Sequence, residues 1–219
     1  MCIPLIFGKI KQEKFFDGDN MENTTSIYGE HKPELERVLE QIMLHVADIR
    51  EKMEQTLGMD PVEHCLGRIK KEDSMREKCR RQNLPETTDS ALNKIFDAVG
   101  VRIVCAFVDD VYTIRDYIAD SGRYEIVKEK DYIRRAKPNG YRSYHMILRV
   151  DGKYHAEIQL RTISMDTWAA LEHHLKYKKK VGGRQELIVG ELKRCADELA
   201  STDLSMQTIR AMILEGANC

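Results

Sequence analysis

Apolar residues recur at helical spacing over residues 33–57, a segment that begins with Pro33 and is followed by Gly58. Apolar side chains three or four positions apart line one face of a helix, and proline at the start and glycine just past the end are typical helix boundaries. The pattern therefore predicts a long amphipathic helix. A second, strongly basic helix is predicted over residues 73–82.

The middle of the chain changes to strand patterns. Residues 97–108 are rich in valine and isoleucine, which is typical of a buried strand, and residues 123–128 resemble another strand. Between them, residues 109–120 have helical spacing after Asp109 and Asp110, which we expect at the helix N-cap.

A hairpin and two helices complete the pattern. Residues 143–150 and 153–161 are strand-like runs separated by Asp151-Gly152, a dipeptide that favours a tight hairpin turn. Residues 163–178 and 185–214 then have helical patterns. This order predicts an α+β fold, with a mixed, mostly antiparallel β-sheet flanked by helices.

The composition indicates a soluble globular protein with one main domain. The 219 residues are 42% hydrophobic and 32% charged, which allows one sizeable core with extensions. We expect a flexible N-terminal tail over residues 1–30, the main domain over residues 31–180, and a helical extension suited to oligomerisation over residues 181–219. No run of about 18 apolar residues is present, so we expect no membrane span.

The charge balance limits the partners. The chain has 35 Lys and Arg residues and 36 Asp and Glu residues, which gives a net charge of −1. Proteins that coat nucleic acid usually carry a large basic excess, so we expect no DNA binding, and the charge does not support RNA binding. The six cysteines form no CxxC pair, which argues against a zinc ribbon and indicates reduced thiols in a cytoplasm.

The second strand of the hairpin carries three polar residues at alternate positions, Glu157, Gln159 and Arg161. Side chains alternate in a strand, so these three share one face. An acid, an amide and a guanidinium suit a polar site. An ordinary solvent-exposed face of an antiparallel sheet is an equally good explanation from this strand alone.

A second carboxylate, Asp97, lies at the start of the predicted central strand. Two carboxylates on neighbouring strands can hold a Mg²⁺ ion that also binds phosphate oxygens. The alternative is that Asp97 only begins the strand. Arg102 lies within the same apolar run, where an unpaired guanidinium would be costly, so we expect it to emerge into a cleft with an anionic or aromatic partner. Its guanidinium plane can also stack on a nucleobase.

Basic residues gather upstream of this strand. Arg68 and Lys70 project to one side if their segment is extended, and Lys78 and Arg81 share a helix face one turn after Ser74. Cations at this spacing fit a triphosphate. If this helix stood alone, its basic residues would be better explained as an ordinary solvent-exposed helix face.

A second basic cluster surrounds a Pro-Asn-Gly turn and contains an aromatic residue. The cluster comprises Lys130, Arg134, Arg135, Lys137 and Arg142. Tyr141 can stack on a base at this turn, and His145 can bond a phosphate or a ribose hydroxyl, although a lone histidine is more often structural. Asp166 lies in the first turn of the next helix. A carboxylate there is stabilised by the helix dipole, which is a sufficient structural reason for it. The functional alternative is that Asp166 accepts hydrogen bonds from the edge of a guanine base.

Five motifs occur along the chain: GRIK (67–70), SMREKCRR (74–81), DAVGVRIVCAFVDDVY (97–112), KEKDYIRRAKPNGYRSYH (128–145) and AEIQLRTISMDTWAALEH (156–173). Together they resemble the synthetase domain of the RelA/SpoT superfamily, particularly the stand-alone small alarmone synthetases of the RelP and RelQ type. The resemblance implies a nucleotidyltransferase-like fold and a GTP pyrophosphokinase. Such an enzyme uses Mg²⁺ to transfer pyrophosphate from ATP to the 3′-hydroxyl of GTP or GDP, and it makes the stringent-response alarmones pppGpp and ppGpp.

The resemblance also implies a role for each candidate residue. Asp97 and Glu157 would be catalytic and would hold the metal, with Glu157 activating the 3′-hydroxyl. The residues implied to bind ATP are Arg68, Lys70, Ser74, Lys78, Arg81 and Arg102, of which the guanidinium groups of Arg68 and Arg102 would sandwich adenine. The residues implied to bind the GTP or GDP acceptor are Lys137, Tyr141, His145, Gln159, Arg161 and Asp166, of which Tyr141 would stack on guanine.

Departures from the family pattern shape the remaining expectations. We find no histidine-aspartate metal motif upstream, so hydrolase activity is not expected. His64 and Leu66 stand where RelQ-type enzymes have the Phe and Thr of their allosteric site, so the segment is more similar to the RelP branch. The resemblance implies a cytoplasmic homotetramer. Two other hypotheses stay open: a nucleotide- or RNA-binding module without chemistry, and a transferase with an adenosine acceptor.

Overall fold

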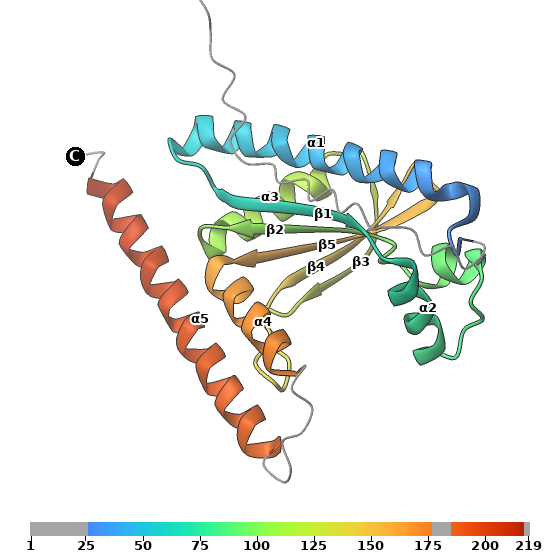
Figure 1. The fold of residues 1–219 in the computed structure, drawn as a ribbon. Helices are drawn as coiled ribbons and strands as arrows, with labels where there is room; N and C mark the ends of the chain where they lie inside the picture. Colours follow the sequence, from blue (N-terminus) through green and yellow to red (C-terminus); the bar gives the residue numbers. More distant parts are fainter. Residues whose placement is uncertain (1–25, 177–184, 217–219) are drawn as a thin grey trace, which may run out of the picture.

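The computed structural model describes residues 26–176 and 185–216, which form one sheet with helices around it (Figure 1). The five-stranded sheet has the order β1-β2-β5-β4-β3. The strands are β1 (Val62–Ile69), β2 (Val99–Cys105), β3 (Glu125–Asp131), β4 (Tyr144–Val150) and β5 (Tyr154–Thr162). Only β2 and β5 run parallel, and the other three pairs are antiparallel, which confirms the predicted mixed, mostly antiparallel sheet.

The helices lie close to their predicted positions. They are α1 (Lys32–Leu57), α2 (Glu72–Arg81), α3 (Val108–Asp120), α4 (Ile163–Lys176) and α5 (Gln185–Gly216). Gly58 ends α1 in the left-handed conformation, with φ of 70°. Residues 177 and 178, which the pattern assigned to the fourth helix, lie outside the described residues.

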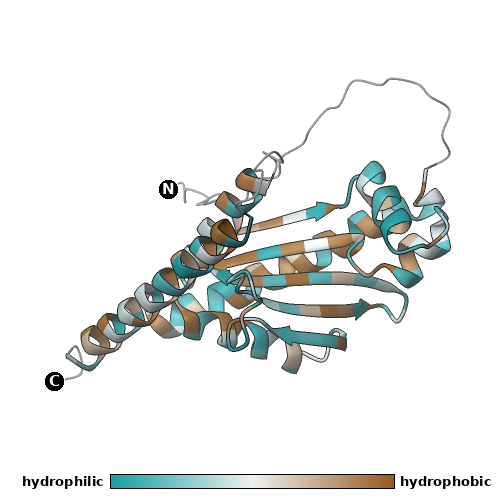
Figure 2. Cartoon of the chain, turned by 90° about the horizontal axis from the view of Figure 1, so that it is seen from below, coloured by the Kyte–Doolittle hydropathy of each residue, from teal (hydrophilic) through white to brown (hydrophobic). Residues whose placement is uncertain are grey.

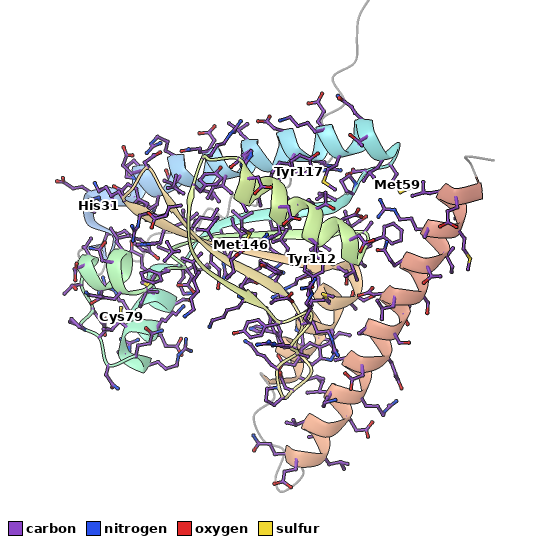
Figure 3. The ribbon with its side chains drawn as sticks, turned by 180° about the vertical axis from the view of Figure 1, so that it is seen from behind. His31, Met59, Cys79, Tyr112, Tyr117 and Met146 are labelled. Atoms are coloured by element: carbon purple, nitrogen blue, oxygen red, sulfur yellow. The ribbon has the colours of Figure 1, made fainter. Side chains whose placement is uncertain are left out.

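One face of the sheet forms the core against α1 and α3. Figure 2 shows hydrophobic and hydrophilic residues alternating along the strands, and Figure 3 shows α3 lying across the sheet in the view from behind, near Met146 of β4. On β1, a side chain at Gly67 would collide with Leu39 of α1, at 2.7 Å, so the glycine lets that helix approach the edge strand. The buried core residues of the central strands include Val101, Ile103, Met146, Leu148, Ile158 and Leu160.

The opposite face carries the polar residues in rows across the strands. Arg68 pairs with Gly100, which pairs with Glu157. Arg102 pairs with Gln159, which pairs with His145. Cross-strand neighbours point to the same face, so the candidate residues share one surface of the sheet.

The predicted hairpin is confirmed. Asp151 and Gly152 have φ values of 53° and 66°, and the Lys153 amide donates to the Val150 carbonyl across them. Residues 151–153 separate the paired Val150 and Tyr154, so β5 begins one residue later than predicted. Register is thereby fixed, and Glu157 and Gln159 face the polar side together with His145.

Several predicted boundaries need correction. The central strand covers Val99–Cys105, so Asp97 lies before it. The N-cap of α3 is Phe107, not the aspartate pair; Asp110 instead accepts a hydrogen bond from the Phe107 amide. Ile27 and Tyr28 are buried, so residues 26–30 belong to the fold and not to a tail, while residues 1–25 lie outside the described residues. The four cysteines that the structure describes are free thiols.

Candidate active site

Asp97 lies between two lysines at the end of the sheet where β2 begins. Its Oδ2 atom is 2.9 Å from Nζ of Lys70 and 2.6 Å from Nζ of Lys78. Lys70 directly follows β1, and its amide donates to the Ala98 carbonyl, which brings its side chain to the start of β2. The helix α2 supplies Lys78. Two ammonium groups on one carboxylate leave an excess of positive charge here.

The other candidate residues of the ATP side lie around this group. Arg68 is exposed and lies opposite Gly100, where an added side chain would come within 3.8 Å of the Arg68 chain. Arg102 projects from the same face, and burial, together with nearby Arg161, lowers its pKa. Ser74 and Arg81 are exposed on α2, and the contacts described for residues 26–176 and 185–216 do not bring either of them to Asp97.

Glu157 is a carboxylate held in its charged form. Its Oε1 atom is 3.3 Å from Nδ1 of His145, and its Oε2 atom accepts a hydrogen bond of 2.8 Å from the Gln159 amide. Burial alone would raise the pKa of Glu157, but the hydrogen bond and charge of His145, the hydrogen bond from Gln159 and the charge of Lys78 together lower it to about 2. Lys78 therefore acts on both Asp97 and Glu157.

A closed ring of hydrogen bonds connects Glu157 to Arg161. Nη2 of Arg161 donates to the Tyr141 hydroxyl at 2.8 Å and to Oε1 of Gln159 at 2.9 Å. The Tyr141 hydroxyl lies 2.9 Å from Nε2 of His145. The Glu157 carboxylate on β5 is therefore held on one oxygen by His145 and on the other by Gln159.

Asp166 joins the two halves of the site. Its Oδ1 atom accepts a hydrogen bond of 3.0 Å from Arg161 and lies 3.3 Å from the guanidinium of Arg102. The family resemblance implied that Arg102 lies on the ATP side and Asp166 on the acceptor side. Their contact places the two predicted sets next to each other.

Tyr141 lies in an aromatic and cationic cluster. The ammonium of Lys137 is 4.6 Å from the ring centroids of both Tyr141 and Tyr132, and the Arg161 guanidinium is 5.2 Å from the Tyr141 ring. Tyr132 also packs edge-on against His145, at 5.4 Å. Sequence reasoning missed Tyr132, although its position between Lys130 and Lys137 was the available signal.

The carboxylates alone do not form a complete metal site. Among the described residues, no group of three or more His, Cys, Asp or Glu side chains could hold an ion. However, Oδ1 of Asp97 is buried without a hydrogen-bond partner, and a buried carboxylate oxygen of this kind suits a hard cation. The Asp97 carboxylate therefore fits a Mg²⁺ ion and would contribute one oxygen ligand to it.

Comparison with known proteins identifies the family. Residues 67–182 match the model described as a region found in RelA/SpoT proteins. The chain is 38% identical over 160 residues to GTP pyrophosphokinase YwaC of Bacillus subtilis, with 70% of this chain and 76% of the relative covered. The chain belongs to the RelA/SpoT family. It is a small alarmone synthetase within that superfamily.

Two further relatives cover almost the whole fold. The chain is 32% identical to GTP pyrophosphokinase YjbM of Bacillus subtilis over 186 residues, which are 82% of this chain and 86% of the relative. The crystal structure of small alarmone synthetase 1 from Bacillus subtilis, bound to its product pppGpp, superposes with a TM-score of 0.72 at 30% identity, covering 84% of this chain and 96% of that chain. This agreement confirms the predicted synthetase fold of the family.

Proposed function

We propose that the chain is a GTP pyrophosphokinase, which transfers pyrophosphate from ATP to the 3′-hydroxyl of GTP or GDP and makes pppGpp or ppGpp. The single observation that carries this function is the pair of carboxylates, Asp97 and Glu157: Lys78 lies 2.6 Å from Asp97, and its charge also lowers the pKa of Glu157. The relatives YwaC and YjbM have the same named activity, which supports the proposal.

The residues of the ATP side bind and neutralise the triphosphate. Lys70 and Lys78 lie within 3 Å of Asp97 and can turn to phosphate oxygens, since both ammonium groups sit on flexible stems. Arg68 and Arg102 stack on adenine from the polar face. Ser74 and Arg81 on the exposed side of α2 reach the same phosphates. Transfer of this kind depends mainly on positioning and charge neutralisation.

Glu157 orients the attacking hydroxyl. The 3′-oxygen attacks the β-phosphorus of ATP in line, the new O–P bond replaces the bond to the α-phosphate oxygen, and AMP leaves. A carboxylate with a pKa of about 2 is a weak base, so Glu157 accepts a hydrogen bond first and takes the proton only as the new bond forms. Asp97 and Glu157 would hold Mg²⁺, which when bound supplies positive charge to the transferred phosphates.

The acceptor binds on the Tyr141 side of the ring of hydrogen bonds. Tyr141 stacks on guanine after Lys137 has moved from its face, and Lys137 then pairs with acceptor phosphates. Asp166 accepts from the guanine edge, while His145, Gln159 and Arg161 hold the ribose and keep Glu157 in place. The homotetramer and the cytoplasmic location implied by the resemblance are parts of the same proposal. Among the described residues, no helix is both long and apolar enough to cross a membrane.

Product analysis tests the function directly. The purified chain is incubated with Mg²⁺, ATP labelled at the γ-phosphate, and GTP, GDP, GMP or ADP as acceptor. Label is expected in the 3′-pyrophosphate of GTP and GDP products. Label in no product would favour a binding module without chemistry, and label with ADP alone would favour an adenosine acceptor.

Matched carboxylate variants make the assay specific. Glu157→Gln is expected to lower turnover by about 10²–10⁴-fold. Glu125→Gln, at a surface carboxylate that pairs with Arg149, is the control and is expected to keep wild-type turnover. Equal turnover in the two variants would remove Glu157 from the mechanism.

A further inference from the structure

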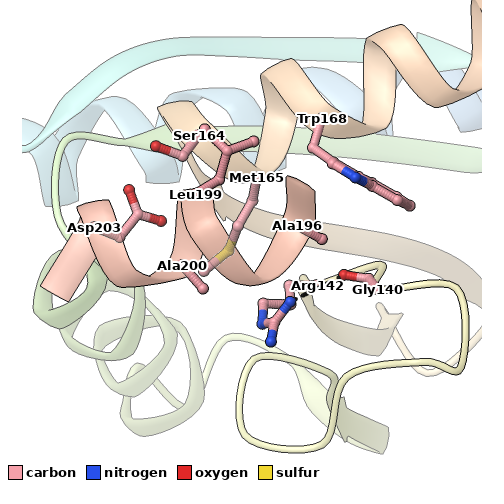
Figure 4. A pocket seen from close by; sticks show the side chains of 9 residues that line it. All are labelled: Gly140, Arg142, Ser164, Met165, Trp168, Ala196, Leu199, Ala200 and Asp203. Carbon is pink, nitrogen blue, oxygen red and sulfur yellow. Dashed lines mark hydrogen bonds between the residues drawn. The ribbon is translucent and has the colours of Figure 1, made fainter. Parts of the chain in front are cut away.

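The loop that carries Tyr141 is in contact with α5, a helix outside the polar face of the sheet. Gly140 has φ of 92°, and a side chain added there would lie 2.7 Å from Cβ of Ala196 and 3.0 Å from Cα of Lys193. Only glycine opposite a small residue permits this approach. Figure 4 shows Gly140 beside Ala196 in the small pocket where the loop, α4 and α5 meet.

Arg142, on the other side of Tyr141, is bound to the same helix. Its Nη2 donates to Oδ1 of Asp197 at 2.8 Å, and its Nη1 donates to the carbonyl of Gly140 at 3.2 Å. Both chain neighbours of Tyr141 are therefore tied to one turn of α5. The Asn139 amide adds a contact with Glu172 of α4.

The helix α5 is itself fixed to the domain at separate points. The Thr162 hydroxyl donates to Asp203 at 2.6 Å and accepts from the Met165 amide, so the same hydroxyl caps the start of α4. The indole of Trp168 donates to the carbonyl of Leu192 at 2.9 Å. A helix held at both ends of this contact can serve as a rigid support.

We propose that α5 positions the acceptor loop, and that Ala196 and Asp197 are positioning residues that set where the Tyr141 ring meets the guanine base. This inference rests on the proposed function, because it assigns the α5 contact to acceptor binding. A shift of the loop would also move the Tyr141 hydroxyl away from Arg161 and His145, and misplacement of about 1 Å can cost about 10²-fold in rate.

Ala196→Leu tests the close approach by adding bulk where Gly140 passes. The KM for GTP is expected to rise by about tenfold or more while the KM for ATP changes by less than about twofold. Ala211→Leu makes the same change at an exposed position of α5 and is expected to leave both constants unchanged. An unchanged KM for GTP in folded Ala196→Leu, or an equal rise in both constants, would overturn the inference.

Arg142→Gln, Asp197→Asn and the double variant provide a milder test if Ala196→Leu does not fold. Each single change removes the Arg142–Asp197 bond and is expected to raise the KM for GTP several-fold; Arg142→Gln also loses the bond to the Gly140 carbonyl, and Asp197→Asn also loses the charge pair with Lys193. Because the Arg142–Asp197 bond is shared, the effect of the double variant is expected to be clearly smaller than the sum of the two single effects. Full additivity of the two effects would overturn the role of this ion pair.

Trp168 gives a second readout that does not need turnover. It is the single tryptophan of the chain, and its ring centroid lies 6.4 Å from that of Tyr141. Ala196→Leu is expected to shift its emission, and Ala211→Leu is not. A wild-type protein that makes no product would defeat the proposed function, whereas an active wild type with identical emission and GTP KM in Ala196→Leu would defeat the positioning role alone.

Discussion

Arg161 donates a hydrogen bond from Nη2 to the hydroxyl of Tyr141, at 2.8 Å. The guanidinium is buried on β5, whereas Tyr141 belongs to the loop before β4. The bond therefore ties the proposed guanine-stacking ring to the strand that carries Glu157. Arg161 also donates hydrogen bonds to Gln159 and Asp166, so this one side chain sets the positions of both of these residues.

Arg161→Lys keeps the charge but cannot serve three partners in these directions. Buried acceptors would be left without donors, so we expect the free energy of unfolding to fall by about 1–3 kcal/mol. The KM for GTP should rise by about tenfold or more, since Tyr141 and Asp166 would lose their shared support. Urea unfolding and steady-state kinetics measure the two effects.

Arg149→Lys is the matched control for this change. Arg149 pairs with Glu125 on the surface of the sheet, and exposed pairs of this kind contribute little. We expect its free energy of unfolding to stay within about 0.5 kcal/mol of wild type. If Arg161→Lys were equally mild, the buried hydrogen bonds would not be the support that their geometry indicates.

Tyr141→Ala and Tyr141→Phe separate the ring from its hydroxyl. Loss of the ring removes base stacking worth about 1–3 kcal/mol, so Tyr141→Ala should raise the KM for GTP by about 5–150-fold. Tyr141→Phe keeps the stack and loses the bonds to Arg161 and His145, so its main expected effect is a several-fold lower kcat. Equal KM values for GTP in the two variants would argue against stacking.

Local patterns in the sequence predicted much of the fold. The spacing that ends at Gly58 predicted α1, and Asp151-Gly152 predicted the hairpin that puts Glu157 beside His145. In contrast, β1 has no clear alternation, because Gly67 lies under Leu39 of α1 and the strand is at an edge of the sheet. Only its contact with β2 reveals it as a strand.

Sequence patterns could not predict the contacts between residues that are far apart in the chain. Arg142 and Asp197 are 55 positions apart, and Thr162 and Asp203 are 41 apart. The motif resemblance named Asp166 and Arg102 but assigned them to different substrates, and only the folded chain shows that they touch. Such pairs depend on how α4 and α5 pack, which no local spacing encodes.

Glu157 should contribute to acid stability in a defined window. Its pKa in the folded protein is lowered from 4.5 to about 2, so its charged form favours folding. The contribution, of about 1–3 kcal/mol, is fully present above pH 4.5 and is lost as the pH falls towards 2. Urea unfolding at stepped pH should therefore show a smaller loss of stability over this window in Glu157→Gln than in wild type. Identical slopes would mean that the carboxylate is not held as the structure indicates.

The ion pair between Arg210 and Asp110 should decide how firmly α5 is docked. Both side chains are buried, Nη1 of Arg210 is 2.8 Å from Oδ1 of Asp110, and the guanidinium lies 4.5 Å from the Phe107 ring. Arg210→Ala would leave a buried carboxylate without its charge partner, and such losses cost about 3–5 kcal/mol. Arg194→Ala, at an exposed arginine of the same helix, is the control and should be nearly neutral.

Removing both charges should be milder than removing one. Burial raises the pKa of Asp110 even with Arg210 beside it, so desolvation of the carboxylate outweighs the attraction. In Asp110→Asn with Arg210→Met, the amide oxygen can still accept from the Phe107 amide, and the methionine can still pack on the Phe107 ring. We therefore expect the double variant to be more stable than Arg210→Ala in urea unfolding. A double variant less stable than Arg210→Ala would show that the buried, unpaired Asp110 carboxylate is not the main cost of the single change.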